Sequence, residues 1–245
     1  MDGRTFDKFV SKQQDGEGVF LKKEDAMPKV TIVTPCLNQG KFLEQTILSV
    51  LSQNYPHLEY IIIDGGSTDG TLDIIKQYEK DISYWISEKD RGMYDATNKG
   101  LKHSSGSILA YLNSDDIYRS NTIQAVVEHF QKHPETSMVF GNTDYIDAQG
   151  DFLYSYRYPA FKYARYIQLN WSSIPQQASF WRRQVHDTIG YFNADFKLAG
   201  DFDFFARLGK NLQIDHIHQV LAALLMWSQK RIALWKQLSR SLNLC

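Results

Sequence analysis

The stretch KVTIVTPCLNQGKFLEQTILSVLSQNYPHLEYIIIDGGSTDG, residues 29–70, holds a strand, a helix and a second strand in that order. Residues 29–35 are an apolar, β-branched run that ends at a proline, and residues 58–66 are a second run that ends in glycines. Between the two runs, apolar residues recur at helical spacing: Phe42, Leu43, Ile47, Val50 and Leu51. This order predicts a βαβ unit, in which a helix joins two parallel strands.

The same alternation continues toward the C-terminus. A helical pattern over residues 71–80 precedes a strand over 82–88, and a helix over about 94–103 precedes a strand over 107–113. Continuous apolar strands of this kind are covered on both faces in folded proteins. The pattern therefore predicts an α/β fold with a Rossmann-like, mostly parallel central sheet that is flanked by helices.

The second half of the chain is less regular. A helix is expected over residues 121–133, with a cap at Ser120 or Asn121. After it, residues 137–158 have the pattern of two strands joined by a turn at 148–150. We therefore expect an irregular region to follow the regular βα units.

Composition excludes several classes of partner and compartment. The chain has 245 residues, of which 43% are hydrophobic, enough for a substantial core. Its formal net charge of −1 gives no field that attracts nucleic acid. Cys36 and Cys245 form neither a disulfide framework nor a zinc site. The longest apolar run near the C-terminus, Val220–Trp227, is far shorter than the roughly 20 residues that span a bilayer. We expect a cytoplasmic protein that binds no nucleic acid.

Four polar segments follow the first four predicted strands: TPCLN (34–38), DGGSTDGT (64–71), EKDRG (88–92) and NSDD (113–116). Because the carboxyl ends of parallel strands meet at one edge of a sheet, these segments gather where open α/β sheets bind their ligands. DGGSTDGT is not an EF-hand loop, since Ile75 stands where that loop needs an acidic residue, and the chain has no phosphate-loop signature. The arrangement predicts a nucleotide cleft.

Two adjacent carboxylates, Asp115 and Asp116, end the fourth segment. At about 4 Å such a pair repels by roughly 1 kcal/mol in water and about 4 kcal/mol at an effective dielectric near 20. One interpretation is that the pair caps the next helix. The other is that it binds a ligand, with the two roles divided because adjacent residues of an extended chain point opposite ways, unless the chain turns sharply there. One carboxylate would then take a ribose hydroxyl, and the other a Mg²⁺ or Mn²⁺ ion shared with a pyrophosphate.

These motifs, in this order, resemble the inverting glycosyltransferases of family 2, which have the GT-A fold with an irregular acceptor-side second half. The resemblance covers residues 29 to about 208. Besides the opening stretch it rests on SEKDRGMYDATNKGLKHSSGSILAYLNSDD (87–116), FWRR (180–183) and GDFDFFARL (200–208). It implies a nucleotide-sugar site formed by Thr34, Pro35, Asn38, Asp64, Asp90, Arg91, Asn98 and Asp115. Within that site it places Asp64 near the base, Asp115 near the ribose, and Asp116 on the divalent metal, Mg²⁺ or Mn²⁺.

The resemblance also implies a catalytic base at the start of a late helix, where Asp201 stands. A capping role for Asp201 is the structural alternative, and Asp203 is the competing candidate for the base. Gly200 replaces a glutamate that is common before the base, and Gln176 stands where close relatives often carry a histidine. The C-terminal part lacks the Gly-Ser-rich loop that relatives use near the active site.

The function so implied is a metal-dependent, inverting transfer of a hexose from a nucleoside diphosphate donor, with UDP-hexose favoured. The acceptor is a hydroxyl group, expected on a saccharide or lipid-linked saccharide in surface polysaccharide synthesis. Two alternatives stay open. One is a catalytically impaired binding protein with the same fold. The other is a sugar-phosphate nucleotidyltransferase, although the Gly-rich, Arg- and Lys-bearing loop of that class is absent after the first strand.

We expect one catalytic domain over residues 29–218, preceded by a polar leader over 1–28 and followed by an amphipathic basic helix over 219–245. The apolar face of that helix holds Trp227, Ile232, Trp235, Leu238 and Leu242. Most of its basic residues fall elsewhere: Lys230, Arg231, Lys236 and Arg240. Such a helix packs on the domain or on a second subunit of a homodimer, or it lies peripherally on the inner face of the cell membrane.

Overall fold

The computed structural model describes residues 27–168 and 174–226. The strands in these ranges are β1 (Val30–Cys36), β2 (Leu58–Asp64), β3 (Tyr84–Ser87), β4 (Ile108–Tyr111), β5 (Asp116–Tyr118), β6 (Met138–Ile146), β7 (Phe152–Tyr156), β8 (Ser179–Arg182) and β9 (Ile214–Leu225). The helices are α1 (Leu43–Leu51), α2 (Thr71–Gln77), α3 (Met93–His103), α4 (Thr122–Lys132), α5 (Tyr163–Gln168), α6 (Val185–Ile189) and α7 (Gly200–Asn211), with short 3₁₀ helices at Glu79–Asp81 and Gln176–Ala178. None of the described helices is long and apolar enough to cross a bilayer.

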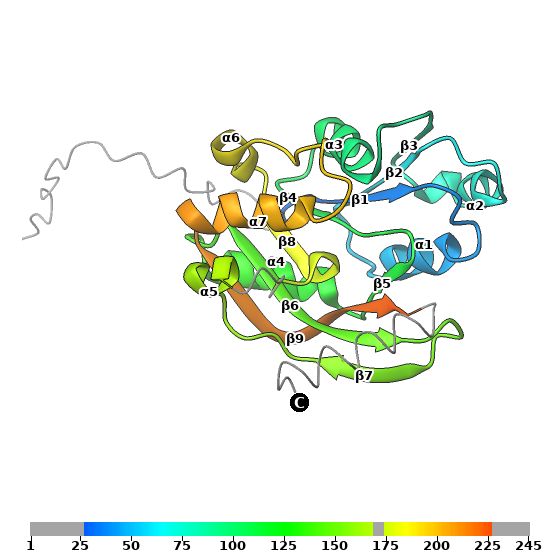
Figure 1. The fold of residues 1–245 in the computed structure, drawn as a ribbon. Coiled ribbons are helices and arrows are strands. Elements are labelled where there is room, and N and C mark those ends of the chain that lie inside the picture. The colour runs from blue at the N-terminus through cyan, green and yellow to red at the C-terminus, as the bar shows by residue number, and fades with distance from the viewer. Residues whose placement is uncertain (1–26, 169–173, 227–245) are drawn as a thin grey trace, which may run out of the picture.

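The described strands form a single sheet in the order β3-β2-β1-β4-β8-β6-β9-β5, with β7 paired to β6 (Figure 1). The first four strands in this order are parallel to one another. Beyond them, β8 is antiparallel to both β4 and β6, whereas β9 is parallel to β6 and antiparallel to β5. The predicted α/β fold is confirmed, and the expected irregular half is the mixed part of the sheet.

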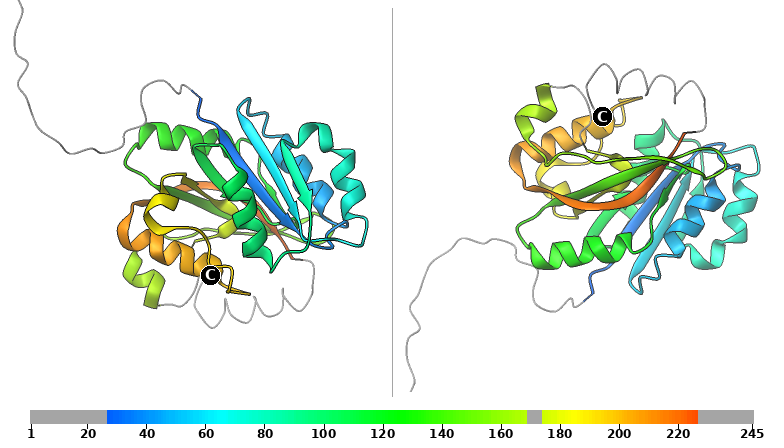
Figure 2. Two further views of the ribbon diagram at one scale, coloured as in Figure 1. Left: turned by 90° about the horizontal axis from the view of Figure 1, so that it is seen from above. Right: turned by 90° about the horizontal axis from the view of Figure 1, so that it is seen from below.

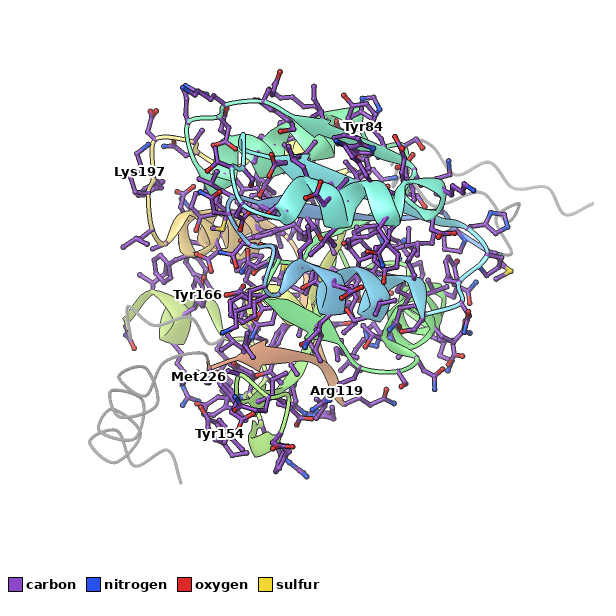
Figure 3. All side chains as sticks on the ribbon, turned by 90° about the vertical axis from the view of Figure 1, so that its right-hand side faces the viewer. Tyr84, Arg119, Tyr154, Tyr166, Lys197 and Met226 are labelled. Carbon is purple, nitrogen blue, oxygen red and sulfur yellow. The ribbon has the colours of Figure 1, made fainter. Side chains whose placement is uncertain are left out.

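Helices cover both faces of the sheet (Figure 2). One core packs α1, α2 and α4 against β1 and β4, and the other packs α3, α6 and α7 against the opposite face. Strand β1 is buried along its whole length, as its unbroken run of apolar and small polar residues predicts. Side chains fill the space between sheet and helices throughout (Figure 3). At the mixed end of the sheet, Arg119 Nη2 lies 2.6 Å from Asp144 Oδ2 and ties the end of β5 to β6.

One expectation of the second half needs correction. Residues 219–225, assigned to the start of a C-terminal helix, are the last part of β9. Their apolar run is buried because β6 and β5 pair on its two sides, and a short apolar run of this kind has no decisive periodicity. The N-cap of α4 is Asn121, as expected, but it has a φ of 61° and its side chain makes no capping bond. The polar leader up to residue 26 and the basic segment 227–245 lie outside the described residues.

Strand β1 is the point where the strand order reverses, because β2 lies on one side of it and β4 on the other. Helix α1, which follows β1, packs on one face of the sheet, and helix α3, which precedes β4, packs on the other, so the carboxyl ends of β1 and β4 lie side by side between them. This is the position at which doubly wound sheets bind nucleotides.

Helix α3 packs closely on the sheet because residue 100 has no side chain. A Cβ at Gly100 would meet both methyl groups of Val33 and would lie 3.2 Å from Ile63 Cγ1. We expect Gly100→Ala to lower the free energy of unfolding by about 1–2 kcal/mol, since overpacking costs about 1–3 kcal/mol and the better helix propensity of Ala returns up to about 1 kcal/mol. Denaturant unfolding measures the change. Gly70→Ala is the control, because nothing lies within 4 Å of its added Cβ. Equal stability of Gly100→Ala and wild type would contradict this account of the packing.

Candidate functional site

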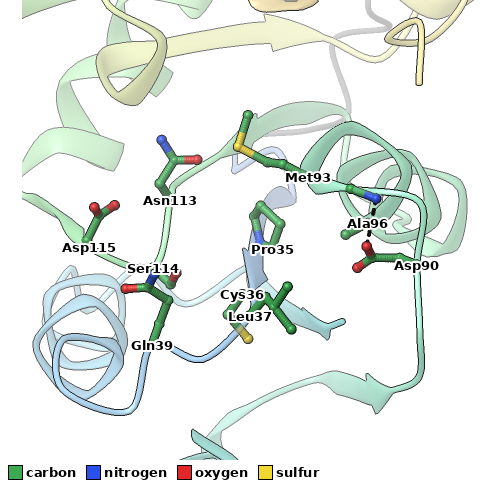
Figure 4. A pocket seen from close by; sticks show the side chains of 11 residues that line it. Pro35, Cys36, Leu37, Gln39, Asp90, Met93, Ala96, Asn113, Ser114 and Asp115 are labelled. Atoms are coloured by element: carbon green, nitrogen blue, oxygen red, sulfur yellow. Dashed lines mark hydrogen bonds between the residues drawn. The ribbon is translucent and has the colours of Figure 1, made fainter. Parts of the chain in front are cut away.

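A cavity of about 350 Å³ opens in the crevice at the carboxyl ends of β1 and β4 (Figure 4). The end of β1, the start of α3 and the loop after β4 supply its walls. Its lining residues are Pro35, Cys36, Leu37, Gln39, Asp90, Gly92, Met93, Ala96, Asn113, Ser114 and Asp115. Three of the predicted donor residues, Pro35, Asp90 and Asp115, thus come together here although they lie far apart in the sequence. Asp90 also accepts a hydrogen bond from the backbone N–H of Gly92 at 2.8 Å, which shapes the turn before α3.

A second cavity of about 400 Å³ adjoins the first, with Asn113 lining both. Its lining residues are Asn113, Asp116, Tyr145, Tyr158, Ile174, Pro175, Gln176, Gln177, Asp201 and Leu224. Asp115 therefore lines one cavity and Asp116 the other, but the reason is a turn rather than an extended chain: Ser114 and Asp115 form the turn, and the N–H of Asp116 donates to the backbone oxygen of Asn113 at 3.0 Å. Helix capping does not explain the pair, because Asn121 is the N-cap of α4 and Asp116 begins β5.

Asn113 is held between the two cavities by its amide nitrogen. Nδ2 donates to Gln176 Oε1 at 3.0 Å and lies 3.3 Å from Asp116 Oδ2, and Gln176 Nε2 donates in turn to the backbone oxygen of Tyr111 at 2.6 Å. The Oδ1 atom of Asn113 is buried and has no hydrogen-bond partner in the part of the chain that the structure describes. A buried unpaired acceptor is uncommon in folded proteins, and its place in the cleft suits a ligand.

The oxygen atoms around Asn113 fit a hard divalent cation. Asn113 Oδ1 and the carboxylates of Asp115 and Asp116 are the donor type that Mg²⁺ and Mn²⁺ prefer. Within residues 27–168 and 174–226, no group of three or more His, Cys, Asp and Glu side chains is arranged to hold a metal. The chain would therefore provide few ligands, and substrate phosphates would complete the coordination, as is usual for Mg²⁺.

Asp64 ends β2 and is fully buried. Its Oδ2 accepts hydrogen bonds from the backbone N–H groups of Gly66 (3.1 Å) and Ser67 (2.9 Å) and from the hydroxyl of Ser87 (2.6 Å), while its Oδ1 accepts from the Ser67 hydroxyl. Burial alone would raise the pKa of Asp64, but these hydrogen bonds outweigh it and hold the pKa below the usual range. Asp64 braces the loop after β2, and contact with a nucleobase would require an exchange of one of these bonds.

The other predicted donor residues also serve the framework and line neither cavity. Thr34 is buried and accepts a hydrogen bond from the Tyr60 hydroxyl at 3.1 Å, and Asn38 Oδ1 accepts from the backbone N–H of Thr68 at 2.9 Å. Arg91 forms an ion pair with Asp95, with Nη2 and Oδ1 2.9 Å apart. Asn98 holds the backbone of Phe192, because its Nδ2 donates to the carbonyl at 2.7 Å and its Oδ1 accepts from the N–H at 3.1 Å.

The contacts of Asp201 and Asp203 distinguish the two candidates for the catalytic base. Asp201 lies in the first turn of α7 and lines the second cavity. Asp203 lines neither cavity, and its Oδ2 accepts from Arg207 Nε at 3.0 Å and Nη2 at 2.9 Å. The carboxylate of Asp203 is therefore committed to an ion pair along its own helix, which leaves Asp201 as the carboxylate that faces the cleft.

Several residues of the cleft have no role in the sequence analysis. Cys36 is one of them: burial first, and the nearby charge of Asp64 second, raise the pKa of its thiol, so it stays protonated and is no nucleophile. Asn113 is another, although its place directly before Ser114 and the carboxylate pair was a usable signal. Gln39 and Met93 carry no sequence signal of their own, because only the fold brings them to the cavity wall.

Comparison with known proteins agrees with this geometry. Residues 31–190 match the family described as Glycosyl transferase family 2. A PGL/p-HBAD biosynthesis glycosyltransferase of Mycobacterium bovis is 31% identical over 204 residues, which are 81% of this chain and 77% of that protein. The putative teichuronic acid biosynthesis glycosyltransferase TuaG of Bacillus subtilis is 39% identical over 121 residues, 48% of this chain and 47% of that protein.

Two solved structures show the same fold at 18% sequence identity. One is S. aureus TarS 1-349 in complex with UDP-GlcNAc, with a TM-score of 0.69 over 84% of this chain. The other is the mannosyltransferase PcManGT from Pyrobaculum calidifontis in complex with GDP-Man and Mn²⁺, with a TM-score of 0.62 over 85% of this chain. This chain spans 60% of each of those two chains and 37% of a longer TarS chain. The chain belongs to glycosyl transferase family 2 and has the GT-A fold of these enzymes.

Proposed function

We propose that this protein transfers a hexose from a UDP-sugar to a hydroxyl group of a saccharide or lipid-linked saccharide, with inversion at the anomeric carbon. The observation that carries the proposal is the pair of adjoining cavities, with Asp115 in one, Asp116 and Asp201 in the other, and Asn113 between them. The UDP-GlcNAc complex of TarS supports the donor class, and the names of the relatives, which refer to PGL/p-HBAD biosynthesis and teichuronic acid biosynthesis, support the acceptor class.

The first cavity suits the nucleotide part of the donor. Its volume of about 350 Å³ falls in the usual range for small-molecule sites, about 300–1,000 Å³. Asp115 provides an acceptor for the ribose hydroxyls, while Leu37 and Met93 provide apolar surface at the same wall. The reducing cytoplasm is the compartment that we propose, because the buried thiol of Cys36 needs no oxidising environment.

Asp116, with Asn113 Oδ1 and Asp115 beside it, would hold the divalent cation. When bound, a Mg²⁺ or Mn²⁺ ion stabilises the negative charge that gathers on the departing diphosphate. The chain's own contribution is to fix these oxygens, since Gln176 anchors Asn113 and the backbone oxygen of Asp116 accepts from the Thr46 hydroxyl at 2.8 Å. The Mn²⁺ in the PcManGT complex supports this choice of metal.

The second cavity suits the acceptor. Tyr145 and Tyr158 contribute aromatic side chains to its lining, which suit contact with a sugar ring, and Asp201 lines the same space. There the acceptor hydroxyl gives its proton to the Asp201 carboxylate, and its oxygen forms a bond to the anomeric carbon while the bond from that carbon to the diphosphate oxygen breaks. Attack from the side opposite the leaving group inverts the configuration. General base assistance of this kind contributes typically ~10²–10⁴ in rate.

We expect the full chain to release UDP from a UDP-hexose in the presence of Mn²⁺ or Mg²⁺ and a saccharide acceptor, and to stop when EDTA removes the metal. The measurement is UDP formation together with the mass of the extended acceptor, across UDP-glucose, UDP-galactose and UDP-GlcNAc. GDP-mannose serves as the control donor. Thermal stabilisation by UDP-sugars without any transfer or hydrolysis would instead identify a binding protein with this fold.

We expect Asp116→Asn to remove the enhancement of UDP binding by Mn²⁺, because the amide is a much weaker metal ligand than the carboxylate. Calorimetric titration with UDP, with and without Mn²⁺, measures the enhancement. Asp187→Asn is the control, since this aspartate is exposed on α6 and lines neither cavity. If Asp116→Asn kept the full enhancement, Asp116 would not be a metal ligand.

We expect Asp201→Asn to reduce kcat by about 10²–10⁴-fold with little change in the dissociation constant of UDP, because the amide keeps the shape of the carboxylate but cannot take the proton. Asp203→Asn is the matched control on the same helix. It loses only a half-exposed ion pair with Arg207, which contributes about 0–1 kcal/mol to stability, and should keep most of its turnover. The reverse pattern would move the base to Asp203.

A further inference from the structure

The helix that carries Asp201 has no cap of its own. The residue before α7 is Ala199, which adopts a left-handed φ of 60° and has no side-chain acceptor for the first N–H groups of the helix. Such N–H groups need a partner when they are not in water. Here the partner comes from another helix: the hydroxyl oxygen of Tyr94, on α3, accepts from the N–H of Gly200 at 2.9 Å and from the N–H of Asp201 at 3.2 Å.

These two bonds decide the direction of a third. A tyrosine hydroxyl has one proton to donate and two lone pairs to accept with. Since backbone N–H groups only donate, both lone pairs of Tyr94 are used, and the proton must point to a different acceptor. That acceptor is Asp201 Oδ1, at 3.2 Å. No other hydrogen bond from the described residues reaches this carboxylate, so Oδ1 is fixed by Tyr94 and Oδ2 is left for the cleft.

The ring of Tyr94 is itself held in place. It is 3% exposed and stacks on Phe192, with ring centroids 5.8 Å apart and an angle of 15° between the planes. Asn98, one turn further along α3, fixes the backbone of Phe192 by two hydrogen bonds, one to its carbonyl oxygen and one from its N–H. Position 200 must also be small, because a Cβ on Gly200 would lie 2.6 Å from Tyr94 Cε2. This explains why glycine, rather than a longer residue, precedes the base.

We propose that Tyr94 is the positioning residue of the catalytic base: its hydroxyl caps α7 and aims the Asp201 carboxylate at the acceptor hydroxyl. The proposal rests on the proposed function, in which Asp201 takes the acceptor's proton. Tyr94 also connects the two cavities: the residue before it, Met93, lines the donor cavity, and its hydroxyl bonds to Asp201 in the other. Asn98 then acts one step further away, by holding the ring against which Tyr94 packs.

The test is the steady-state kinetics of Tyr94→Phe with a UDP-hexose and a saccharide acceptor. The ring remains, so the stack on Phe192 is kept and only the hydroxyl is lost. We expect kcat to fall about 10–100-fold, as for a misplaced catalytic group, while KM for the donor stays within about twofold of wild type. Gly200→Ala, which pushes the hydroxyl away from Asp201 without removing it, should show the same split between kcat and KM.

Tyr166→Phe is the matched control. Tyr166, on α5, is also fully buried, and its hydroxyl donates to the backbone oxygen of Phe202 at 3.3 Å. Phe202 is the neighbour of Asp201 on α7. The change therefore removes a buried tyrosine hydroxyl of α5 that bonds to α7, without touching Asp201, and kcat should stay within about twofold of wild type. An equal loss of kcat in both tyrosine variants would mean that general loosening of α7 is responsible, and would overturn the proposal.

A double variant separates this proposal from the function on which it rests. If Tyr94 acts through Asp201, then Tyr94→Phe adds no further loss of kcat to Asp201→Asn. Additive losses, or a normal kcat in Tyr94→Phe beside an inactive Asp201→Asn, would overturn the role of Tyr94 and leave Asp201 as the base. Full turnover by Asp201→Asn would overturn the proposed base itself.

Discussion

The structure depends on one constraint, the burial of β1 between two parallel neighbours. The strand is inaccessible along its length and pairs with β2 on one side and β4 on the other. The connection into β2 passes over one face of the sheet through α1 and the connection into β4 passes over the other face through α3, so the carboxyl ends of β1 and β4 meet at an edge between them. Below that edge, the apolar strands and the two cores bury the hydrophobic surface that stabilises the fold. The loops above are therefore available for polar residues, which add little to the core and can serve a ligand.

The charge at this edge supports the choice of ligand and metal. Asp90 and Asp115 line one cavity and Asp116 and Asp201 the other. A diphosphate brought to this edge would be repelled by each carboxylate at 4 Å by about 4 kcal/mol at an effective dielectric near 20. Of the two basic residues next to Asp90 in the sequence, Arg91 is already paired with Asp95 and Lys89 lines neither cavity. A divalent cation removes this conflict, because it attracts carboxylate and phosphate together, and the buried Oδ1 of Asn113 adds a neutral ligand at the same place.

Sequence patterns predict the elements that depend on neighbouring residues, and they miss those that depend on contacts with distant parts of the chain. The strands and helices from β1 to β4 follow from continuous apolar runs and helical spacing, whereas Asp115 and Asp116 are divided between the cavities by a turn at Ser114 and Asp115. Residues 219–225 were assigned to a helix because their strand exists only through pairing with β6 and β5, far away in the sequence. Likewise, Asn98 holds Phe192, a residue 94 positions away, and no local pattern contains that contact. The choice between Asp201 and Asp203 was open, although Arg207, four residues after Asp203, was a readable hint.

The cap that α3 provides for α7 fixes the start of a helix in the irregular half of the fold. Helix α7 follows a stretch with little regular structure and begins at a left-handed alanine, so its own sequence fixes its start poorly. Helix α3, in contrast, packs on β2 and on β1, which is buried along its whole length, through the close contact at Gly100. Because Tyr94 of α3 accepts from the first N–H groups of α7, the start of α7 and with it Asp201 are tied to the helix that packs on β1 and β2. Helix α3 also supplies Met93 and Ala96 to the first cavity. Under the proposed function, this one helix therefore positions both the donor and the catalytic base.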